Sequence, residues 1–386
     1  MEIINNERNI ETMADDNKKC GTDKVNYFLH SQRIYEYYTS NVEGKTMCYD
    51  GEKIRFKNVA IPNGIIKMYM EVINNVHDNV RRTVKNKIIP TDVNIRVEKT
   101  TVTVRNHGTV IPISKNNDGK WLPETIFSIN GHEYIEHDFG TGVKLTNMLS
   151  SVFTVKIKEG DVLYSQTWKN NARECENPVI ITAKKYESEK NYVEVSYQPD
   201  FKYFNITELS KDMIGVHEAY GITLSYVSNF NGCTEVPVVF NGNRYAMDNI
   251  QTYSSRFYHE KGEIPCYITE IEMDYQLNVV DNPNNGSFLS FVNGTHTKEG
   301  GVHEDALYDI LINNVNEIIK KSGKDHKVDT TWVKNNMSVI INIYADGPKF
   351  KTSDREYLLS PAYKISICDD YLDRMKNWRC VKSIIE

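Results

Sequence analysis

Three polar side chains recur at helical spacing near residue 75, and their types could assist hydrolysis of a nucleoside triphosphate. Glu71, Asn75 and Asp78 stand at i, i+4 and i+7, so they share one face beside an apolar stripe. A carboxylate can orient water, and an amide oxygen one turn later can ligate Mg²⁺ without adding charge. A solvent-exposed helix face without a function has the same pattern, so spacing alone leaves both interpretations open.

A glycine-rich turn follows about seventy residues later. The residues concerned open a predicted helix, where backbone amides can hold phosphates and a lysine can neutralise them: Gly140, Thr141, Gly142, Val143 and Lys144. The P-loop pattern GxxxxGK[ST] is absent, so such a site is not of the Walker type. A plain glycine turn explains this segment equally well.

The elements that must position these residues are predicted from periodicity. Apolar residues predict a helix over 64–82, after Pro62. Alternation predicts a β-hairpin over 93–104, whose second strand ends at Asn106-His107-Gly108. Further predicted elements are a helix and strand within 140–158 and strands at 193–197, 222–227 and 236–240, the last closed by an Asn241-Gly242 turn.

The remaining chain predicts a second domain. The polar stretch 253–263 is interpreted as the boundary. Strands at 267–273 and 288–292, a helix at 303–321 with one apolar stripe, a strand at 337–344 and a polar loop follow. The order is α+β twice over, which argues against a Rossmann or P-loop sheet.

Composition excludes several classes of protein. The chain has 386 residues, 40% hydrophobic residues and a net charge of -6, which is typical of two or three globular domains. No apolar run is long enough to cross a membrane, and the polar opening argues against a signal peptide. Seven scattered cysteines without a CxxC pair argue against disulfides and zinc and favour an intracellular location. His77 and His107 are interpreted as packing or surface residues.

A series of motifs resembles a known family. They are EVINNVHDN at 71–79, NHGTVIP at 106–112, PETIF at 123–127, GTGVKLTNMLSSVFTV at 140–155, SFVNGTHTKEGGVH at 290–303 and VKNNMSVIIN at 333–342. Their order is similar to that of the ATPase region of type IIA DNA topoisomerases, in the eukaryotic-like and viral branch. The resemblance runs from about residue 60 to about residue 360.

The resemblance implies an α+β fold, with a Bergerat (GHKL) α/β sandwich followed by a transducer domain of the ribosomal-protein-S5-like type. The expected division is a flexible arm over 1–24, the ATP-binding domain over 25–258 and the transducer over 259–386. The implied function is an ATP-hydrolysing, Mg²⁺-dependent gate that dimerises on ATP and captures double-stranded DNA.

The resemblance also assigns roles to individual residues. Glu71 falls on the general base and Asn75 on the Mg²⁺ ligand. Arg355 replaces the family lysine that reaches the γ-phosphate, with an exposed loop arginine as the alternative. The implied nucleotide-binding residues are Asn75, Asp78, Asn79, Asn106, which contacts adenine, Gly108, Gly140, Thr141, Gly142, Val143 and Lys144.

Several positions depart from the family pattern. Val110 replaces a glycine, Asp138 and Phe139 replace an arginine and an asparagine, and the loop between Phe127 and Gly140 is shorter. These departures motivate an alternative, a dimeric DNA clamp or regulatory protein of the same fold with impaired ATPase activity.

Expected partners follow from what the chain lacks. Neither a DNA-cleaving tyrosine in its family context nor the acidic toprim signature is found, so cleavage is expected from another region or subunit. The expected partners are double-stranded DNA, a second copy of the chain and that cleavage core, and no membrane. An AT-rich coding source and divergent motifs suggest a viral protein, located in the nucleus or cytoplasm of its host.

Overall fold

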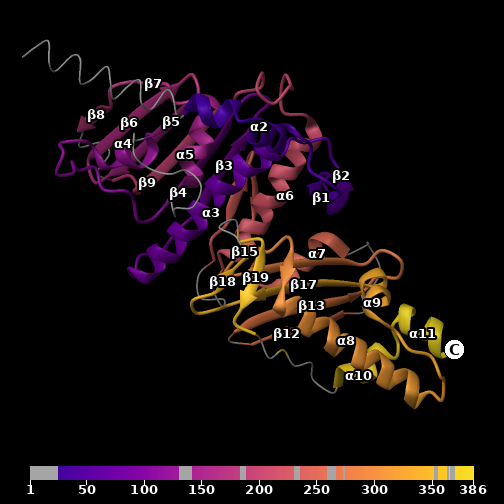
Figure 1. Cartoon of the computed structure of the whole chain (residues 1–386). Helices are drawn as coiled ribbons and strands as arrows, with labels where there is room; N and C mark the ends of the chain where they lie inside the picture. Colours follow the sequence, from indigo (N-terminus) through magenta and orange to yellow (C-terminus); the bar gives the residue numbers. More distant parts are fainter. Residues whose placement is uncertain are drawn as a thin grey trace, which may run out of the picture. The chain divides into compact units, whose positions relative to one another are not determined.

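The computed structural model describes residues 25–129, 141–182, 188–229, 235–258, 267–272, 274–351, 355–362, 365 and 370–386. The chain folds into two compact units (Figure 1). The first unit runs to Ser228 and resumes up to Ala246, whereas Met247–Glu386 belongs to the second. Each unit has its own sheet and its own helices. Among the described residues, no helix is both long and apolar enough to cross a membrane.

The first unit is built on a large, mainly antiparallel sheet of order β11-β10-β3-β4-β9-β5-β6-β7, with β8 also pairing with β6. The predicted hairpin is confirmed as β3 and β4, which pair antiparallel. β10 joins β3 in parallel, and Asn241 and Gly242 have the positive φ values of a tight hairpin turn. The strands are β3 (Val93–Val97), β4 (Val102–His107), β5 (Ser150–Glu159), β6 (Val162–Lys169), β7 (Glu174–Cys175), β8 (Val179–Thr182), β9 (Tyr192–Pro199), β10 (Val238–Phe240) and β11 (Asn243–Tyr245).

Helices α3, α5 and α6 pack against this sheet and against one another. The predicted helix at 64–82 is confirmed as α3, which begins after Pro62 and buries Ile65, Val72 and Val76. Arg82 and Lys85 lie in its last turn, where cations offset the helix dipole. The helices are α2 (Gln32–Thr39), α3 (Asn63–Lys85), α4 (Leu122–Phe127), α5 (Thr141–Met148) and α6 (Lys211–Val227); a separate hairpin is formed by β1 (Lys45–Tyr49) and β2 (Ile54–Asn58).

The strand predicted at 222–227 is wrong, because these residues form the second half of α6. The helix is buried nearly all round from Met213 to Val227, so it lacks the polar face that gives a helix its periodicity. Its β-branched and aromatic residues then resemble a buried strand. Ser210 caps the helix, since its side chain accepts a hydrogen bond from the Met213 N–H at 3.2 Å.

The second unit contains a five-stranded sheet of order β12-β13-β17-β14-β15. β14 and β17 run parallel and the other pairs are antiparallel, so the chain crosses over through α8 between them. The predicted strands at 267–273, 288–292 and 337–344 are confirmed. The strands are β12 (Tyr267–Ile271), β13 (Tyr275–Asp281), β14 (Ser287–Val292), β15 (Thr295–His296) and β17 (Met337–Ile343).

Helices cover both faces of this sheet (Figure 1), and β13 and β17 are buried along their whole length. Leu277, Val339 and Ile341 pack in one core with Leu311 and Ile318 of α8. The predicted helix at 303–321 is confirmed as α8. The helices are α7 (Ile250–Tyr258), α8 (Val302–Lys321), α9 (Thr330–Asn336), α10 (Asp370–Met375) and α11 (Arg379–Ile385).

The two compact units divide between Ala246 and Met247. The domain boundary expected between residues 258 and 259 stays a prediction. Helix α7 groups with the second unit because it packs on that sheet. Ser254 Oγ donates to Asn278 Oδ1 at 2.7 Å, and the hydroxyl groups of Tyr258 and Ser287 lie 2.8 Å apart. The polar composition of 253–258 therefore reflects buried hydrogen bonds rather than a linker.

The second unit also contains a small second sheet, within and beside the segment predicted as a polar loop. Its order is β16-β19-β18, formed by β16 (Gly300–Gly301), β18 (Lys349–Phe350) and β19 (Tyr357–Ser360). Gly301 has a φ of 146°, and an added Cβ would stand 2.5 Å from the Leu358 carbonyl oxygen. Only glycine fits this pairing, which fixes β16 against the strand that follows Arg355.

Candidate nucleotide-binding site

Glu71 lies on the exposed side of α3 but is itself sheltered. Its side chain is 26% exposed, and its Oε1 lies 3.7 Å from Nζ of Lys67, one turn earlier, whose side chain is 18% exposed. Both groups are thus mostly shielded from bulk water. A charge pair in such a sheltered position interacts more strongly than a pair at an open surface. The ion pair was not predicted, although its i, i+4 spacing is visible in the sequence.

The carboxylate of Glu71 rests on the start of α5. A Cβ added at Gly142 would overlap Glu71 Oε2 and would stand 2.9 Å from Cγ. Helices α3 and α5 pack together, and Thr146 Oγ1 donates to the Met68 carbonyl oxygen at 3.2 Å. The structure therefore brings together the two motifs that the sequence singled out.

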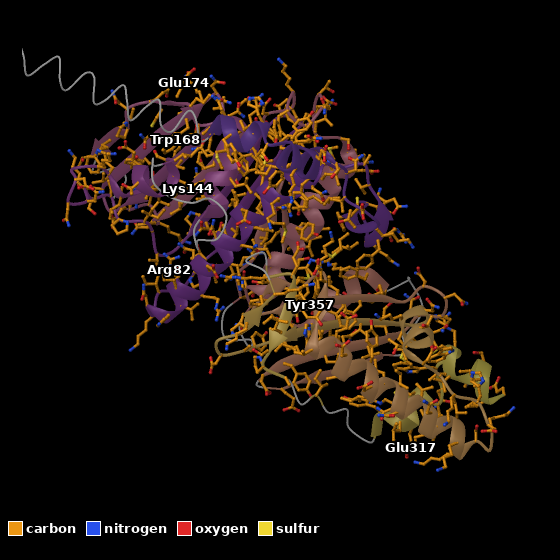
Figure 2. All side chains as sticks on the ribbon, in the orientation of Figure 1. Arg82, Lys144, Trp168, Glu174, Glu317 and Tyr357 are labelled. Atoms are coloured by element: carbon orange, nitrogen blue, oxygen red, sulfur yellow. The ribbon has the colours of Figure 1, made fainter. Side chains whose placement is uncertain are left out.

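Asn75 and Asp78 are both exposed on α3, so the polar face predicted from their spacing is present. On α5, Val143 is buried at 7% exposure and Lys144 is partly exposed. Figure 2 marks Lys144 on α5 and Arg82 near the far end of α3. Thr141 is the first residue of α5, whereas Gly140, Asp138 and Phe139 lie outside the described residues.

Asn79 is buried and bonded within the protein. Its Nδ2 donates to the Thr109 carbonyl oxygen at 2.7 Å, and its Oδ1 accepts from Thr83 Oγ1 at 3.1 Å. Thr83 Oγ1 also accepts from the Thr109 N–H at 3.0 Å. Asn79 and Thr83 thus connect α3 to the turn after β4. Sequence reasoning missed Thr83, although Asn79 and Thr83 have i, i+4 spacing.

Asn106 is 5% exposed at the end of β4. Among the described atoms, its Nδ2 and the hydroxyl of Thr109 are buried without a hydrogen-bond partner. Gly108 between them has a φ of 135°, which other residues rarely adopt. Val110 has a negative φ, so replacement of the family glycine there does not strain the backbone.

His107 is held from the other side of β4. Its Nδ1 lies 3.2 Å from Asp92 Oδ1, and its ring packs edge-on to Tyr192. Burial raises the pKa of the Asp92 carboxyl, but a hydrogen bond from Thr91 and the charge of His107 outweigh it, and the pKa lies below its usual value. His107 thus contacts Asp92 and Tyr192, and its interpretation as a packing or surface residue stays a prediction.

Arg355 belongs to the second unit. It precedes β19, has a φ of 60° and is partly exposed. The next residue is fixed, because the Glu299 N–H donates to the Glu356 carbonyl oxygen at 2.9 Å. Among the described residues, no group of three or more His, Cys, Asp or Glu side chains could hold a metal ion.

The chain is similar to type II topoisomerases over most of its length. Residues 233–378 match the family model described as DNA gyrase B. DNA topoisomerase 2 of Saccharomyces cerevisiae is 29% identical over 373 residues, which are 87% of this chain and 25% of that protein. DNA topoisomerase 2 of Invertebrate iridescent virus 6 is 27% identical over 353 residues, 85% of this chain and 30% of that protein. The chain thus spans about a quarter of the length of these curated relatives.

Solved structures extend the likeness to the fold. The ATPase region of Saccharomyces cerevisiae topoisomerase II has a TM-score of 0.77 at 25% identity, covering 93% of this chain and 95% of that chain. The ATPase and transducer domains of DNA topoisomerase II from Balamuthia mandrillaris have a TM-score of 0.75 at 22% identity, covering 93% and 94%. The fold is therefore that of a GHKL ATPase domain followed by a transducer domain, which confirms the predicted fold class. In sequence and in fold, the chain is thus similar to the ATPase region of type II DNA topoisomerases, at a low identity.

Proposed function

We propose that the first unit binds ATP with Mg²⁺ and hydrolyses it. The observation that carries this proposal is the contact of the Glu71 carboxylate with Gly142 at the start of α5. A helix N-terminus favours phosphate groups, and a carboxylate beside it can orient the water that attacks the terminal phosphate. The two unpartnered polar groups of Asn106 and Thr109 fit a base, since a nucleotide edge would satisfy them.

Individual residues take the following roles in the proposal. Glu71 accepts the proton of the attacking water, and Lys67 holds its carboxylate. Asn75 would ligate Mg²⁺ through its amide oxygen, and the ion would neutralise phosphate charge. Arg355 would contact the γ-phosphate. The other nucleotide-binding residues are Asp78, Asn79, Asn106, Gly108, Gly140, Thr141, Gly142, Val143 and Lys144, with Asn79 acting through Thr109.

We further propose that ATP closes the chain into a homodimeric gate that captures double-stranded DNA for strand passage. The likeness to yeast and viral DNA topoisomerase 2 supports this proposal. Since the chain spans about a quarter of those proteins, DNA cleavage is assigned to a separate region or subunit. The proposed location is inside the cell, in the host nucleus or cytoplasm if the protein is viral.

An ATPase-impaired dimeric clamp of the same fold is the second candidate. It is favoured by Arg355, whose planar guanidinium on a left-handed backbone would approach a phosphate differently from a lysine. This candidate predicts nucleotide binding and dimerisation without turnover.

The decisive test compares the 386-residue chain with a Glu71→Gln variant, which keeps the size of the side chain and removes the base. We expect Mg²⁺-dependent ATP hydrolysis in the wild type and a loss of about 100-fold in the variant, with ATP affinity retained. Arg355→Ala is expected to slow turnover by a similar factor, because it removes a charge that stabilises the transition state. Equal background rates in wild type and Glu71→Gln would contradict the enzyme and favour the clamp.

Dimerisation is tested separately by gel filtration with and without a non-hydrolysable ATP analogue. A shift towards dimer on addition of the analogue is expected for both candidates. No shift at any analogue concentration would contradict the gate.

A further inference from the structure

The hydroxyl group of Thr83 joins helix α3 to the turn after β4. Thr83 is fully buried, and its Oγ1 donates to Asn79 Oδ1 at 3.1 Å while it accepts from the Thr109 N–H at 3.0 Å. Asn79 closes the connection, since its Nδ2 donates to the Thr109 carbonyl oxygen at 2.7 Å. Both backbone polar groups of Thr109 are thus bonded to side chains of α3.

The same side chain fits against Gly108. A Cβ added at Gly108 would stand 2.6 Å from Thr83 Oγ1 and 2.8 Å from its Cγ2. The φ of Gly108 is 135°, so the turn depends on glycine for its conformation as well as for the space that Thr83 fills. Thr83 therefore determines the path of the backbone between Asn106 and Thr109.

This turn carries two unsatisfied groups. Asn106 Nδ2 and Thr109 Oγ1 are buried and have no partner among the described residues. Buried polar groups without a partner cost free energy, and a ligand that bonds to both recovers it. One is a donor and the other can donate or accept. The pair suits the adenine edge where the N1 acceptor lies beside the 6-amino group, whereas the same edge of guanine has an N1–H donor beside a carbonyl oxygen.

We propose that Thr83 is a positioning residue that gives the nucleotide site its selectivity for adenine over guanine. Thr83 does not touch the base; it holds the turn so that Asn106 and Thr109 present their polar groups in one arrangement. A site built to hydrogen-bond a ligand discriminates strongly against an analogue that leaves its buried groups unpaired. The inference rests on the proposed function, because it assumes that a nucleotide occupies the site.

The test uses the 386-residue chain and isosteric changes. Thr83→Val keeps the shape and removes both hydrogen bonds, whereas Thr83→Ser keeps the hydroxyl group. Thr223→Val is the matched control, because Thr223 is a buried helical threonine whose hydroxyl group bonds to the Ala219 carbonyl oxygen at 2.9 Å. Binding of non-hydrolysable ATP and GTP analogues is measured by calorimetry with Mg²⁺, and folding by thermal melting.

We expect Thr83→Val to bind the adenine analogue about tenfold more weakly and to lose most of the preference over the guanine analogue. In steady-state hydrolysis, KM for ATP should rise by a similar factor while kcat stays within about twofold of the wild type. Thr83→Ser and Thr223→Val should keep the wild-type preference. If the valine variant does not fold, Thr83→Cys replaces it, and a partial loss in the same direction is expected because a thiol bonds weakly.

The outcomes separate the two proposals. If the wild type binds neither analogue, the proposed function fails. If the wild type prefers adenine and a folded Thr83→Val keeps that preference, the positioning role fails while the function stands. Loss of preference in Thr223→Val would equally overturn the role of Thr83, since any buried hydroxyl group would then have the same effect.

Discussion

The carboxylate of Glu71 lies directly on Gly142, so that any side chain at position 142 would overlap Glu71 Oε2. Glu71 comes from the middle of α3 and Gly142 from the first turn of α5. Glu71 can therefore occupy this position only because Gly142 has no side chain.

Gly142→Ala is therefore expected to displace Glu71 and to reduce ATP hydrolysis by about 100-fold, because small misplacements of catalytic groups have large kinetic effects. The measurement is steady-state ATPase activity, together with the melting temperature. Gly119→Asn is the control, since Gly119 has open space around it and a φ of 76° that asparagine tolerates. Full activity in Gly142→Ala would show that Glu71 has room to move without consequence.

Lys67→Met is expected to reduce hydrolysis by about tenfold with little change in nucleotide affinity, because the sheltered Glu71 carboxylate loses the cation 3.7 Å away. Lys67→Arg keeps the charge and should retain more activity. Single-turnover rates separate the chemical step from binding. Equal rates in the methionine and arginine variants would indicate that the charge of Lys67 does not contribute.

Acidification is expected to destabilise the first unit through His217. Burial lowers the pKa of His217 from 6.5 to about 4. Between these two values the unfolded chain binds a proton that the folded chain does not, so stability falls as the pH drops through this window. One such group contributes a loss of about 2 kcal/mol at pH 5 relative to pH 7.5.

His217→Phe tests this contribution by urea unfolding at pH 7.5 and pH 5. The phenyl ring keeps the packing on Tyr69, whose ring centroid lies 4.5 Å from that of His217. The difference in free energy of unfolding between the two pH values should shrink by about 2 kcal/mol. His30→Gln, at an exposed position, should leave it unchanged. An undiminished difference in His217→Phe would assign the acid sensitivity to other groups.

Gly301→Ala is expected to destabilise the second unit by about 2 kcal/mol, since the residue has a φ of 146° and its Cβ would stand 2.5 Å from the Leu358 carbonyl oxygen. The loss of pairing between β16 and β19 should also slow hydrolysis without weakening nucleotide binding, because Arg355 precedes β19. Thermal melting and ATPase rates measure the two effects. Gly323→Asn, with open surroundings, is the control. If Gly301→Ala is destabilised but hydrolyses ATP at the normal rate, the pairing of β16 with β19 is not needed for the role of Arg355.

Local pattern predicted much of this fold. The stripe of α3, the hairpin of β3 and β4, and the crossover helix α8 each have one apolar face, so their periodicity is visible. Helix α6 is buried nearly all round, and its second half was therefore mistaken for a strand. The cap at Ser210 was the available signal of a helix.

The candidate site also has features that the local sequence pattern predicts and features that it does not. The shared face of Glu71, Asn75 and Asp78 follows from spacing on one helix. The contact of Glu71 with Gly142 and the bonds of Thr83 to Thr109 join segments distant in sequence, and no local pattern contains them. The resemblance supplied the role of Asn79 but not its bonds to Thr109 and Thr83.

Helix α3 also fixes the distance between two parts of the candidate nucleotide site. It carries Glu71 beside the start of α5 and, two turns later, Asn79, which holds the turn after Asn106. Eight residues of α-helix span about 12 Å. Under the proposed function, this segment of α3 sets the distance between the two ends of the nucleotide site. The base would be held at the end near Asn79, and the last phosphate would lie at the end near Glu71. A nucleotide lacking its terminal phosphate would then fill the base end and fall short of Glu71.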